Sequence, residues 1–184
     1  MRAPVLAQNS HKTPADQLDN DYPRWPKMKL LAIDDEQLNL EVLSAMLADT
    51  GYTRVRTLND PREVLSVCSD FEPDLILLDL IMPGFDGFEV LSALREGYDE
   101  TIPVIMLTGD TSEETRRRAL RAGATDFLVK PFDRLEMLLR IGNLLQMRQL
   151  QLQLDNQRSA LEEALRMRTA ELREMQAQLE QIGA

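Results

Sequence analysis

This 184-residue sequence has almost none of the residues that bind soft metals or form disulfides, with one cysteine, Cys68, and one histidine, His11. A single cysteine cannot form an internal disulfide, which fits the reducing environment of the cytoplasm. Because Cys68 falls in the helical pattern of residues 63–69, we expect it to be a small buried side chain and not a reactive thiol. The same shortage of cysteine and histidine excludes a zinc site.

Long apolar runs are also missing. No stretch approaches the roughly 20 apolar residues that a membrane-spanning helix needs. Residues 1–14 contain no apolar segment of signal-peptide length. We therefore expect a cytoplasmic protein that does not insert into a membrane.

Positive charge is scarce, because 21 lysine and arginine residues face 31 acidic residues, for a formal net charge of −10. A broad nucleic-acid-binding surface needs clustered positive charge, so we expect no direct nucleic-acid binding by this chain. Glycine is missing where a dinucleotide- or flavin-binding domain needs it, since the residues after the first apolar run are DDEQLNL. The sequence therefore argues against a dinucleotide-binding domain and against a flavin-binding domain.

From residue 28 onward, short apolar runs alternate with helical patterns. We interpret as strands the runs at residues 30–33, 53–58, 75–78, 102–107 and 126–129. Helices are expected from Leu38 to Gly51, from Pro61 with Asp60 as its cap, from Phe88 to Leu94, from Ser112 to Ala122, and from Asp133 onward. Strands that alternate with helices form a parallel sheet covered on both faces. The expected fold is therefore α/β, a doubly wound, flavodoxin-like five-stranded parallel sheet in the order 2-1-3-4-5.

The composition divides the chain into three parts. Residues 1–27 are polar and proline-rich, and we expect them to be a disordered N-terminal tail. Residues 28–143 carry the alternating strand and helix signals of the α/β domain. Residues 144–184 continue the last helix of that domain, and we expect them to form a coiled coil.

The C-terminal helix carries an apolar stripe with the spacing of a coiled coil. From Leu144 to Ile182, nine of the twelve positions spaced alternately three and four residues apart are apolar. This segment would extend about 60 Å at about 1.5 Å per residue, so it cannot bury its whole stripe on the small domain. We expect a second copy of the chain as its partner; a single helix folded back onto the domain is the alternative. The polar residues Gln151, Arg158 and Arg168 interrupt the stripe, and they could set its register at a cost in stability.

Polar residues follow four of the apolar runs at the point where each run ends. They are Asp34 with Asp35, Asp79, Thr108 with Gly109, and Lys130. Because the carboxyl ends of parallel strands form the ligand crevice of such a sheet, we expect these residues to meet at one edge. Taken alone, Asp34 and Asp35 are equally well explained as a helix N-cap. Two carboxylates about 4 Å apart repel by roughly 4 kcal/mol at an effective dielectric constant of about 20. A divalent cation removes that cost, and oxygen ligands favour Mg²⁺.

Each of the other groups suits phosphoryl transfer. Asp79 is the natural nucleophile, because a carboxylate can accept a phosphoryl group as an aspartyl phosphate. Lys130 offers a positive charge to a phosphoryl oxygen, Thr108 offers a hydroxyl donor, and Gly109 offers a backbone N–H that can approach the anion closely. Singly, Thr108 could be a strand-end hydroxyl and Lys130 a solvated charge, but their joint occurrence favours the chemistry. A phosphohydrolase of the dehalogenase type would have a second carboxylate where this chain has Ile81.

At these residues the chain resembles the receiver domains of two-component response regulators, over about residues 28–145. The resemblance rests on Asp34-Asp35 after the first strand, Asp79 in LILLDLIMPGFDGFEVL, Thr108-Gly109 after PVIML, and Lys130-Pro131-Phe132 after DFLV. It implies that Asp79 accepts a phosphoryl group from the phosphohistidine of a cognate histidine kinase or phosphotransfer protein. Such a domain takes part in its own phosphorylation and dephosphorylation but is not a conventional enzyme.

The resemblance also implies a metal site. Mg²⁺ would be held by Asp35, Asp79 and the backbone carbonyl of Ile81, with Asp34 acting through water. The Lys130–Pro131 peptide bond would be cis, which proline tolerates at modest cost.

A conformational switch is implied as well. In receiver domains the Thr108 hydroxyl would move toward the phosphoryl group, and the aromatic ring of Phe127 would swing inward. The face formed by the fourth helix, fifth strand and fifth helix would then change, and this face is a second expected homodimer surface. Positions Ile81 and Asp110 adjust the lifetime of the phosphorylated form in this family. The fourth helix carries four arginines, and we expect most of them to form a solvated face, while one or two could pair across the dimer with Asp126 or Asp133; they are Arg116, Arg117, Arg118 and Arg121.

The segment RMRTAELREMQAQLE resembles signalling linkers that precede HD-GYP phosphodiesterases, diguanylate cyclases, serine phosphatases and histidine kinases. The chain contains no motif of those domains. We expect the dimeric coiled coil to relay the signal to an effector domain missing from this chain. Alternatively, the protein is a stand-alone regulator whose coiled coil itself docks a partner.

Overall fold

The computed structural model describes residues 27–182, and the burial of their side chains through residue 178. Apart from Lys27, the predicted tail of residues 1–27 lies outside the described residues. The chain divides into two compact units, residues 1–145 and residues 146–184.

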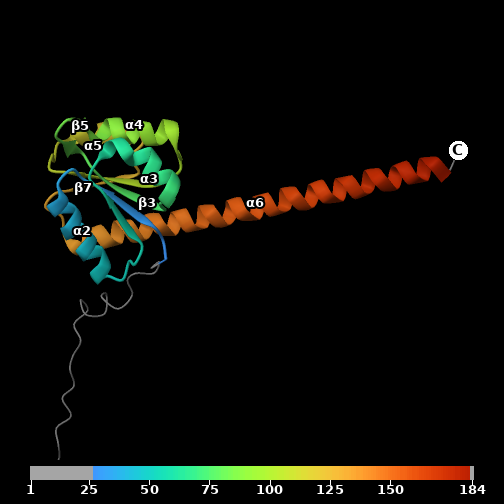
Figure 1. The fold of residues 1–184 in the computed structure, drawn as a ribbon, viewed down its shortest axis with the longest axis horizontal. Helices are drawn as coiled ribbons and strands as arrows, with labels where there is room; N and C mark the ends of the chain where they lie inside the picture. The colour runs from blue at the N-terminus through green and yellow to red at the C-terminus, as the bar shows by residue number, and fades with distance from the viewer. Residues whose placement is uncertain (1–26, 183–184) are drawn as a thin grey trace, which may run out of the picture. The chain divides into compact units, whose positions relative to one another are not determined.

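The first unit is built on a five-stranded parallel sheet (Figure 1). In spatial order its strands are β2 (Val55–Leu58), β1 (Leu30–Ile33), β3 (Leu75–Asp79), β6 (Val104–Thr108) and β7 (Asp126–Val129). Every neighbouring pair is parallel, which confirms the predicted order 2-1-3-4-5. The sequence did not predict the small antiparallel hairpin that follows β3, formed by β4 (Ile81–Met82) and β5 (Phe85–Asp86).

Helices connect the strands of the sheet. They are α2 (Gln37–Asp49), α3 (Val64–Phe71), α4 (Gly87–Gly97), α5 (Glu113–Arg121) and α6 (Arg134–Ile182). The Asp60 side chain accepts a hydrogen bond from the Arg62 N–H, as expected of a cap, but a 3-10 turn, η1 (Pro61–Glu63), precedes α3. The strands expected at 53–58 and 102–107 begin later, at Val55 and Val104. In the second case the reason is Pro103, which has no N–H to donate to the sheet.

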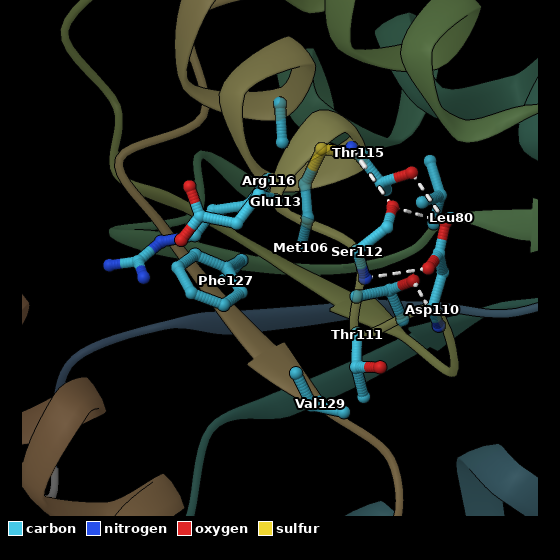
Figure 2. Close-up of a pocket in the computed structure, with 12 residues that line it drawn as sticks. Leu80, Met106, Asp110, Thr111, Ser112, Glu113, Thr115, Arg116, Phe127 and Val129 are labelled. Atoms are coloured by element: carbon cyan, nitrogen blue, oxygen red, sulfur yellow. Dashed lines mark hydrogen bonds between the residues drawn. The ribbon is translucent and has the colours of Figure 1, made fainter.

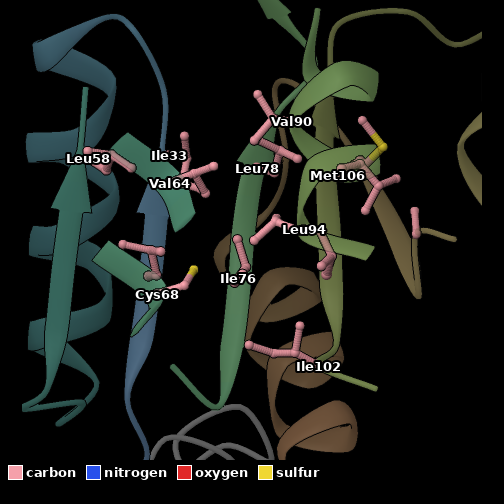
Figure 3. Packing of buried hydrophobic residues seen from close by; sticks show 14 of the residues in the cluster. Ile33, Leu58, Val64, Cys68, Ile76, Leu78, Val90, Leu94, Ile102 and Met106 are labelled. Atoms are coloured by element: carbon pink, nitrogen blue, oxygen red, sulfur yellow. The ribbon is translucent and has the colours of Figure 1, made fainter. Parts of the chain in front are cut away.

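Alternate residues of each strand pack against opposite layers of helices. In β1, Leu31 and Ile33 join a cluster with residues of α3 and α4, whereas Leu30 and Ala32 pack with residues of α2 and α6. This alternation is what a strand covered on both faces requires. In the first cluster Cys68 lies among aliphatic side chains (Figure 3), and burial raises the pKa of its thiol to about 11. Cys68 is therefore a packing residue, as expected.

The helix α2 turns a narrower face to the core than its apolar spacing suggested. It buries Leu40, Leu43 and Leu47, which share one side of the helix. Leu38 and Val42, which belong to the same apolar pattern, are exposed. A helix of mixed composition can carry apolar residues outside its buried stripe, and the pattern alone did not separate the two groups.

The second unit consists of α6 from residue 146 onward. The helix is continuous from Arg134 to Ile182, so the last helix of the domain and the C-terminal segment are one element, as predicted. Much of its predicted stripe is exposed, including Met147, Leu154, Leu161, Leu165, Leu172 and Met175. Within residues 27–182, every helix is either too short or too polar to span a bilayer.

Candidate functional site

The carboxyl edge of the sheet brings the predicted site residues together. Asp34 directly follows β1, Asp79 ends β3, Thr108 ends β6, and Lys130 directly follows β7. The ladder continues beyond the last strand, because the Lys130 N–H donates to the Thr108 carbonyl oxygen at 2.7 Å. The Lys130–Pro131 peptide bond is cis, as the family resemblance implied.

Asp34, Asp35 and Asp79 form a compact acidic cluster. One carboxylate oxygen from each residue lies within 4.8 Å of the others. Asp34 and Asp79 are only 2% and 6% exposed, and Asp35 is partly buried. Lys130 bridges two of the acids, with its Nζ 2.6 Å from Asp79 Oδ1 and 3.0 Å from Asp34 Oδ2. One ammonium group therefore offsets only part of the charge of three carboxylates.

The start of α2 holds the Asp34 carboxylate in place. The Glu36 N–H donates to Asp34 Oδ1 at 2.9 Å, and the Asn39 side-chain amide lies 3.1 Å from both carboxylate oxygens. Asn39 was not among the site residues predicted from the sequence. An amide in the first helical turn after two adjacent acids was the signal that could have found it.

The charges of the site are strongly coupled. Burial raises the pKa of Asp79, while hydrogen bonding to Lys130 and to the backbone of Ile81 acts in the opposite direction. Burial alone would lower the pKa of Lys130, but its hydrogen bonds to Asp79 and Asp34 outweigh burial, so the pKa is raised. Lys130 is therefore charged at neutral pH, and the surplus negative charge of the acids is costly in a buried site.

The donor set of the cluster fits a hard divalent cation. Its three residues offer carboxylate oxygens and neither thiolate nor imidazole. A cation among them would replace repulsion with attraction and would counteract the rise in the pKa of Asp79. Ile81, whose side chain is 66% exposed, stays beside the cluster through its backbone hydrogen bond to Asp79.

Thr108 is linked to the first turn of α5. Thr108 is buried, and its hydroxyl oxygen accepts a hydrogen bond from the Asp110 N–H at 3.0 Å. The Asp110 carboxylate in turn accepts from the Ser112 N–H at 2.7 Å and from the Thr115 hydroxyl at 2.5 Å. These hydrogen bonds, chiefly the one from Thr115, lower the pKa of Asp110. A displacement of Thr108 would therefore also displace the residues at the beginning of α5.

A cavity of about 90 Å³ lies between Thr108 and Phe127 (Figure 2). Its walls include the apolar side chains of Leu80, Met106 and Val129. Phe127 belongs to β7, and its side chain is partly buried at the edge of this space. Since its ring has no hydroxyl, any movement into the cavity would be driven by packing.

Two glycines near the site differ in what the fold demands of them. A Cβ atom at Gly109 would have no heavy atom within 4 Å, so the protein itself does not require glycine there. A Cβ atom at Gly87 would lie 2.5 Å from the Asp79 carbonyl oxygen and 2.8 Å from Leu80 Cα. Gly87 thus lets α4 begin directly against the end of β3. Gly87 was not among the residues predicted from the sequence, although the glycine in FDGFEV was visible.

Asp126 and Asp133, the acids considered as possible partners across a dimer, have partners within this chain. Arg140 of α6 lies 2.9 and 2.7 Å from the two carboxylate oxygens of Asp126. The Asp133 carboxylate accepts hydrogen bonds from backbone N–H groups in the first turn of α6. On α5, Arg118 pairs with Asp86 at 3.2 Å. A dimer through the face of α5, β7 and α6 therefore stays a prediction.

Comparison with known families gives a match over most of the first unit. The sequence model of the family described as "Response regulator receiver domain" matches residues 30–142. The chain is 37% identical over 118 residues to the transcriptional regulatory protein PcoR of Escherichia coli, covering 64% of this chain and 51% of PcoR. It is 41% identical over 118 residues to the response regulator MprA of Mycobacterium leprae, with the same shares of each chain. The chain thus spans about half the length of these curated relatives.

Solved structures resemble the fold. The chemotaxis protein CheY4 of Vibrio cholerae matches with a TM-score of 0.59 and 36% identity, covering 64% of this chain and 98% of CheY4. NtrX of Brucella abortus matches with a TM-score of 0.63 and 30% identity, covering 70% of this chain and 29% of NtrX. The shares covered indicate that the likeness concerns the sheet and its helices.

Proposed function

Because this chain belongs to the response regulator receiver domain family, we propose that Asp79 accepts a phosphoryl group from the phosphohistidine of a cognate histidine kinase or phosphotransfer protein. The observation that carries the proposal is Lys130, which bridges Asp34 and Asp79 inside a buried acidic cluster. In the transfer, a carboxylate oxygen of Asp79 forms the new O–P bond while the P–N bond to the donor imidazole breaks. The bonding pair stays with that nitrogen, and because the other ring nitrogen of the donor carries a proton, the imidazole leaves as the neutral ring.

The family binds Mg²⁺ at an acidic pocket, and the residues of this cluster suit that ion. Asp35, Asp79 and the backbone carbonyl of Ile81 would hold it, with Asp34 acting through water. When bound, Mg²⁺ supplies positive charge beside the phosphoryl oxygens. The fixed orientation of Asp34 and the surplus negative charge of the cluster support this assignment.

Three groups of the chain would hold the transferred phosphoryl group. Lys130 is charged and already within 2.6 Å of Asp79, so it can contact a phosphoryl oxygen there. The Thr108 oxygen accepts a hydrogen bond from Asp110, which leaves its own O–H proton free to donate. Gly109 would contribute its backbone N–H, with open space around its Cα.

The same residues provide the switch. Thr108 moves toward the phosphoryl group, and Phe127 follows into the apolar cavity beside it. The movement alters the face formed by α5, β7 and α6. The hydrogen bond between Thr108 and Asp110 supports this route, because it ties the site to the start of α5.

We assign the output to α6. Its first turns bury Met137, Ile141 and Leu145 in the domain core, and its later apolar residues form the exposed stripe. Two copies of this cytoplasmic protein would pair through that stripe as a coiled coil, and through the face of α5, β7 and α6. The dimer then relays the signal to an effector domain outside this chain. A stand-alone regulator whose coiled coil docks a partner is the second candidate, favoured by the length of the exposed stripe.

Incubation with acetyl phosphate and Mg²⁺ followed by intact-mass measurement tests the phosphoacceptor role. The chain should gain about 80 Da, the mass of one HPO₃ unit added at a carboxylate. The Asp79→Asn variant should gain nothing, and the wild type without Mg²⁺ should react far less. A wild-type chain that never gains this mass, or an Asp79→Asn variant that gains it equally, overturns the assignment. Sedimentation with and without beryllofluoride then measures whether pairing responds to the phosphorylated form.

A further inference from the structure

The helix α5 is held to the sheet with little apolar contact. Of its nine residues only Ala119 is buried, whereas α4 buries four of its eleven residues. Buried apolar side chains are what normally fix a helix to a core. The position of α5 therefore depends more than that of its neighbours on contacts made by polar side chains.

Two arginines of α5 stack on aromatic rings. The guanidinium carbon of Arg116 lies 4.5 Å from the centroid of the Phe127 ring, and that of Arg118 lies 3.9 Å from the Phe88 ring. Arg118 also pairs with Asp86. Among the residues that the structure describes, Arg116 has no carboxylate within ion-pair distance. Figure 2 shows Arg116 beside the Phe127 ring, at the edge of the cavity.

A third arginine approaches the same ring from α6. The guanidinium carbon of Arg140 lies 6.0 Å from the centroid of Phe127. Arg140 is fixed by two acids, at 2.7 Å from Asp126 and 2.8 Å from Glu136. Phe127 thus has one arginine neighbour that is anchored elsewhere and one, Arg116, that is not. Only Arg116 can therefore move with the Phe127 ring, or separate from it, without breaking an ion pair.

The ring of Phe127 packs in part against an apolar cluster of the core and is stacked by Arg116. In the position observed, Phe127 contacts Arg116 at the outer edge of the cavity. The space toward Thr108 is walled by apolar side chains, including Leu80 and Met106. A ring that entered this space would gain apolar contacts and lose its stack with Arg116.

On the basis of the proposed function, we propose that Arg116 is a latch that holds Phe127 in its outer position and thereby opposes the phosphorylated conformation. Phosphorylation at Asp79 draws Thr108 inward, Phe127 takes the space that opens, and Arg116 releases the ring. The loss of this stack removes one of the two aromatic contacts of α5. By linkage, a contact made only in the unphosphorylated form weakens the binding of any ligand that requires the other form.

The variant Arg116→Gln tests the latch through the affinity of the full chain for beryllofluoride in the presence of Mg²⁺, measured by isothermal titration calorimetry. The loss of a cation–π contact at an exposed site should make beryllofluoride bind about two- to fivefold more tightly. A purely electrostatic role has the opposite sign, because removal of a positive charge weakens binding of an anion. Arg117→Gln is the matched control. It removes the same charge from the neighbouring residue, whose partner is Glu113 and not the ring, and it should not tighten binding.

The same substitution in a chain that lacks the Phe127 ring separates the effect of the ring contact from the effect of the positive charge. In a Phe127→Leu chain, Arg116→Gln should leave the affinity for beryllofluoride unchanged, because no ring remains for the arginine to hold. Unchanged or weaker binding by Arg116→Gln in the otherwise wild-type chain overturns the latch, as does equal tightening by Arg117→Gln. Arg116 is exposed, so its replacement leaves the fold intact. The comparison of Arg116→Gln with the wild type and with Arg117→Gln therefore tests the latch without the Phe127→Leu chain. A wild-type chain that binds no beryllofluoride overturns the proposed function instead.

Discussion

The two units of this chain place their apolar side chains in opposite ways. Between residues 30 and 145 both faces of the sheet are covered, and alternate residues of the strands are buried on opposite sides. From Met147 to Met175, large apolar side chains of the stripe of α6 are exposed. A domain with two covered faces completes its own core, whereas a helix with an exposed stripe needs another surface. The first unit covers its own core, whereas the second leaves its apolar side chains exposed, which is the basis for the partner that we propose.

A similar contrast exists inside the first unit. The side chains of the acidic cluster stand at the ends of fully buried strands and are held by hydrogen bonds of fixed geometry. The helix α5 buries only Ala119, and its arginine side chains stack on aromatic rings of neighbouring elements. The proposed chemistry thus lies at the ends of buried strands, and the proposed conformational change involves the helix with the fewest buried residues.

A pair of leucine substitutions should show the contrast between the two units most strongly. Leu78→Ala removes a fully buried side chain of β3 and should lower the free energy of unfolding by about 2–5 kcal/mol. Leu161→Ala removes the same atoms from the exposed stripe; it should weaken dimerisation and leave the unfolding of the domain unchanged. Urea denaturation at several protein concentrations, with sedimentation, measures both. Equal destabilisation by the two variants would mean that the units share one core.

A pair of glycine substitutions should have the next largest effect. Gly87→Ala forces a Cβ atom against the backbone of Asp79 and Leu80, which cannot move without distorting β3, and should cost about 1–3 kcal/mol. Gly109→Ala places its Cβ in open space and should change stability much less. Thermal unfolding of both variants provides the test. A cost at Gly109 as large as that at Gly87 would show that the site, and not the close approach of α4, demands glycine.

The smallest effect concerns the pH dependence of stability without metal. Because the pKa of Asp79 is raised on folding, the folded chain binds this proton more tightly than the unfolded chain does. The protonated Asp79 side chain therefore stabilises the folded chain fully at pH values below 3.8, the usual pKa of this group. That stabilisation is lost as the pH rises through the raised pKa that Asp79 has in the folded chain. At neutral pH Asp79→Asn should be slightly more stable than the wild type, and Mg²⁺ should narrow the difference.

Asp70→Asn is the matched control for that experiment, because Asp70 pairs with Arg56 on the surface. Its stability should follow that of the wild type at every pH. Lower stability of Asp79→Asn at neutral pH would show that the ion pair with Lys130 outweighs the burial of the acid.

The sequence was most informative where strands are buried on both faces. Such strands are continuous apolar runs, so residues 30–33 and 75–78 were recognisable without any partner strand, and the shorter apolar run at residues 127–129 indicated the edge strand β7. The residue that ends each run was then a candidate for the sheet edge, and the structure brings Asp34, Asp79 and Lys130 together there. Their roles in phosphoryl transfer stay predictions until the mass measurement is made.

The features that were not predicted from the sequence depend on close contacts in space and have no periodic pattern along the chain. The strands β4 and β5 have two residues each, too few to show an alternation. Gly87 is required only because α4 begins against the backbone of Asp79. Asn39 matters only because its amide reaches Asp34. Asn39 and Gly87 were visible in the sequence, but only the tertiary structure shows the contacts that make these residue types necessary.

By itself, the sequence determined the alternation of strands and helices, the residues that end the strands and the apolar stripe of α6, because each is a pattern of neighbours along the chain. Only the tertiary structure decided that Asp126 pairs with Arg140 and that Arg116 stacks on Phe127. It also decided that Lys130 reaches Asp79 and Asp34, which lie 51 and 96 residues away in the sequence. Contacts of this kind depend on how the packed layers bring distant side chains together, and no local pattern encodes that arrangement.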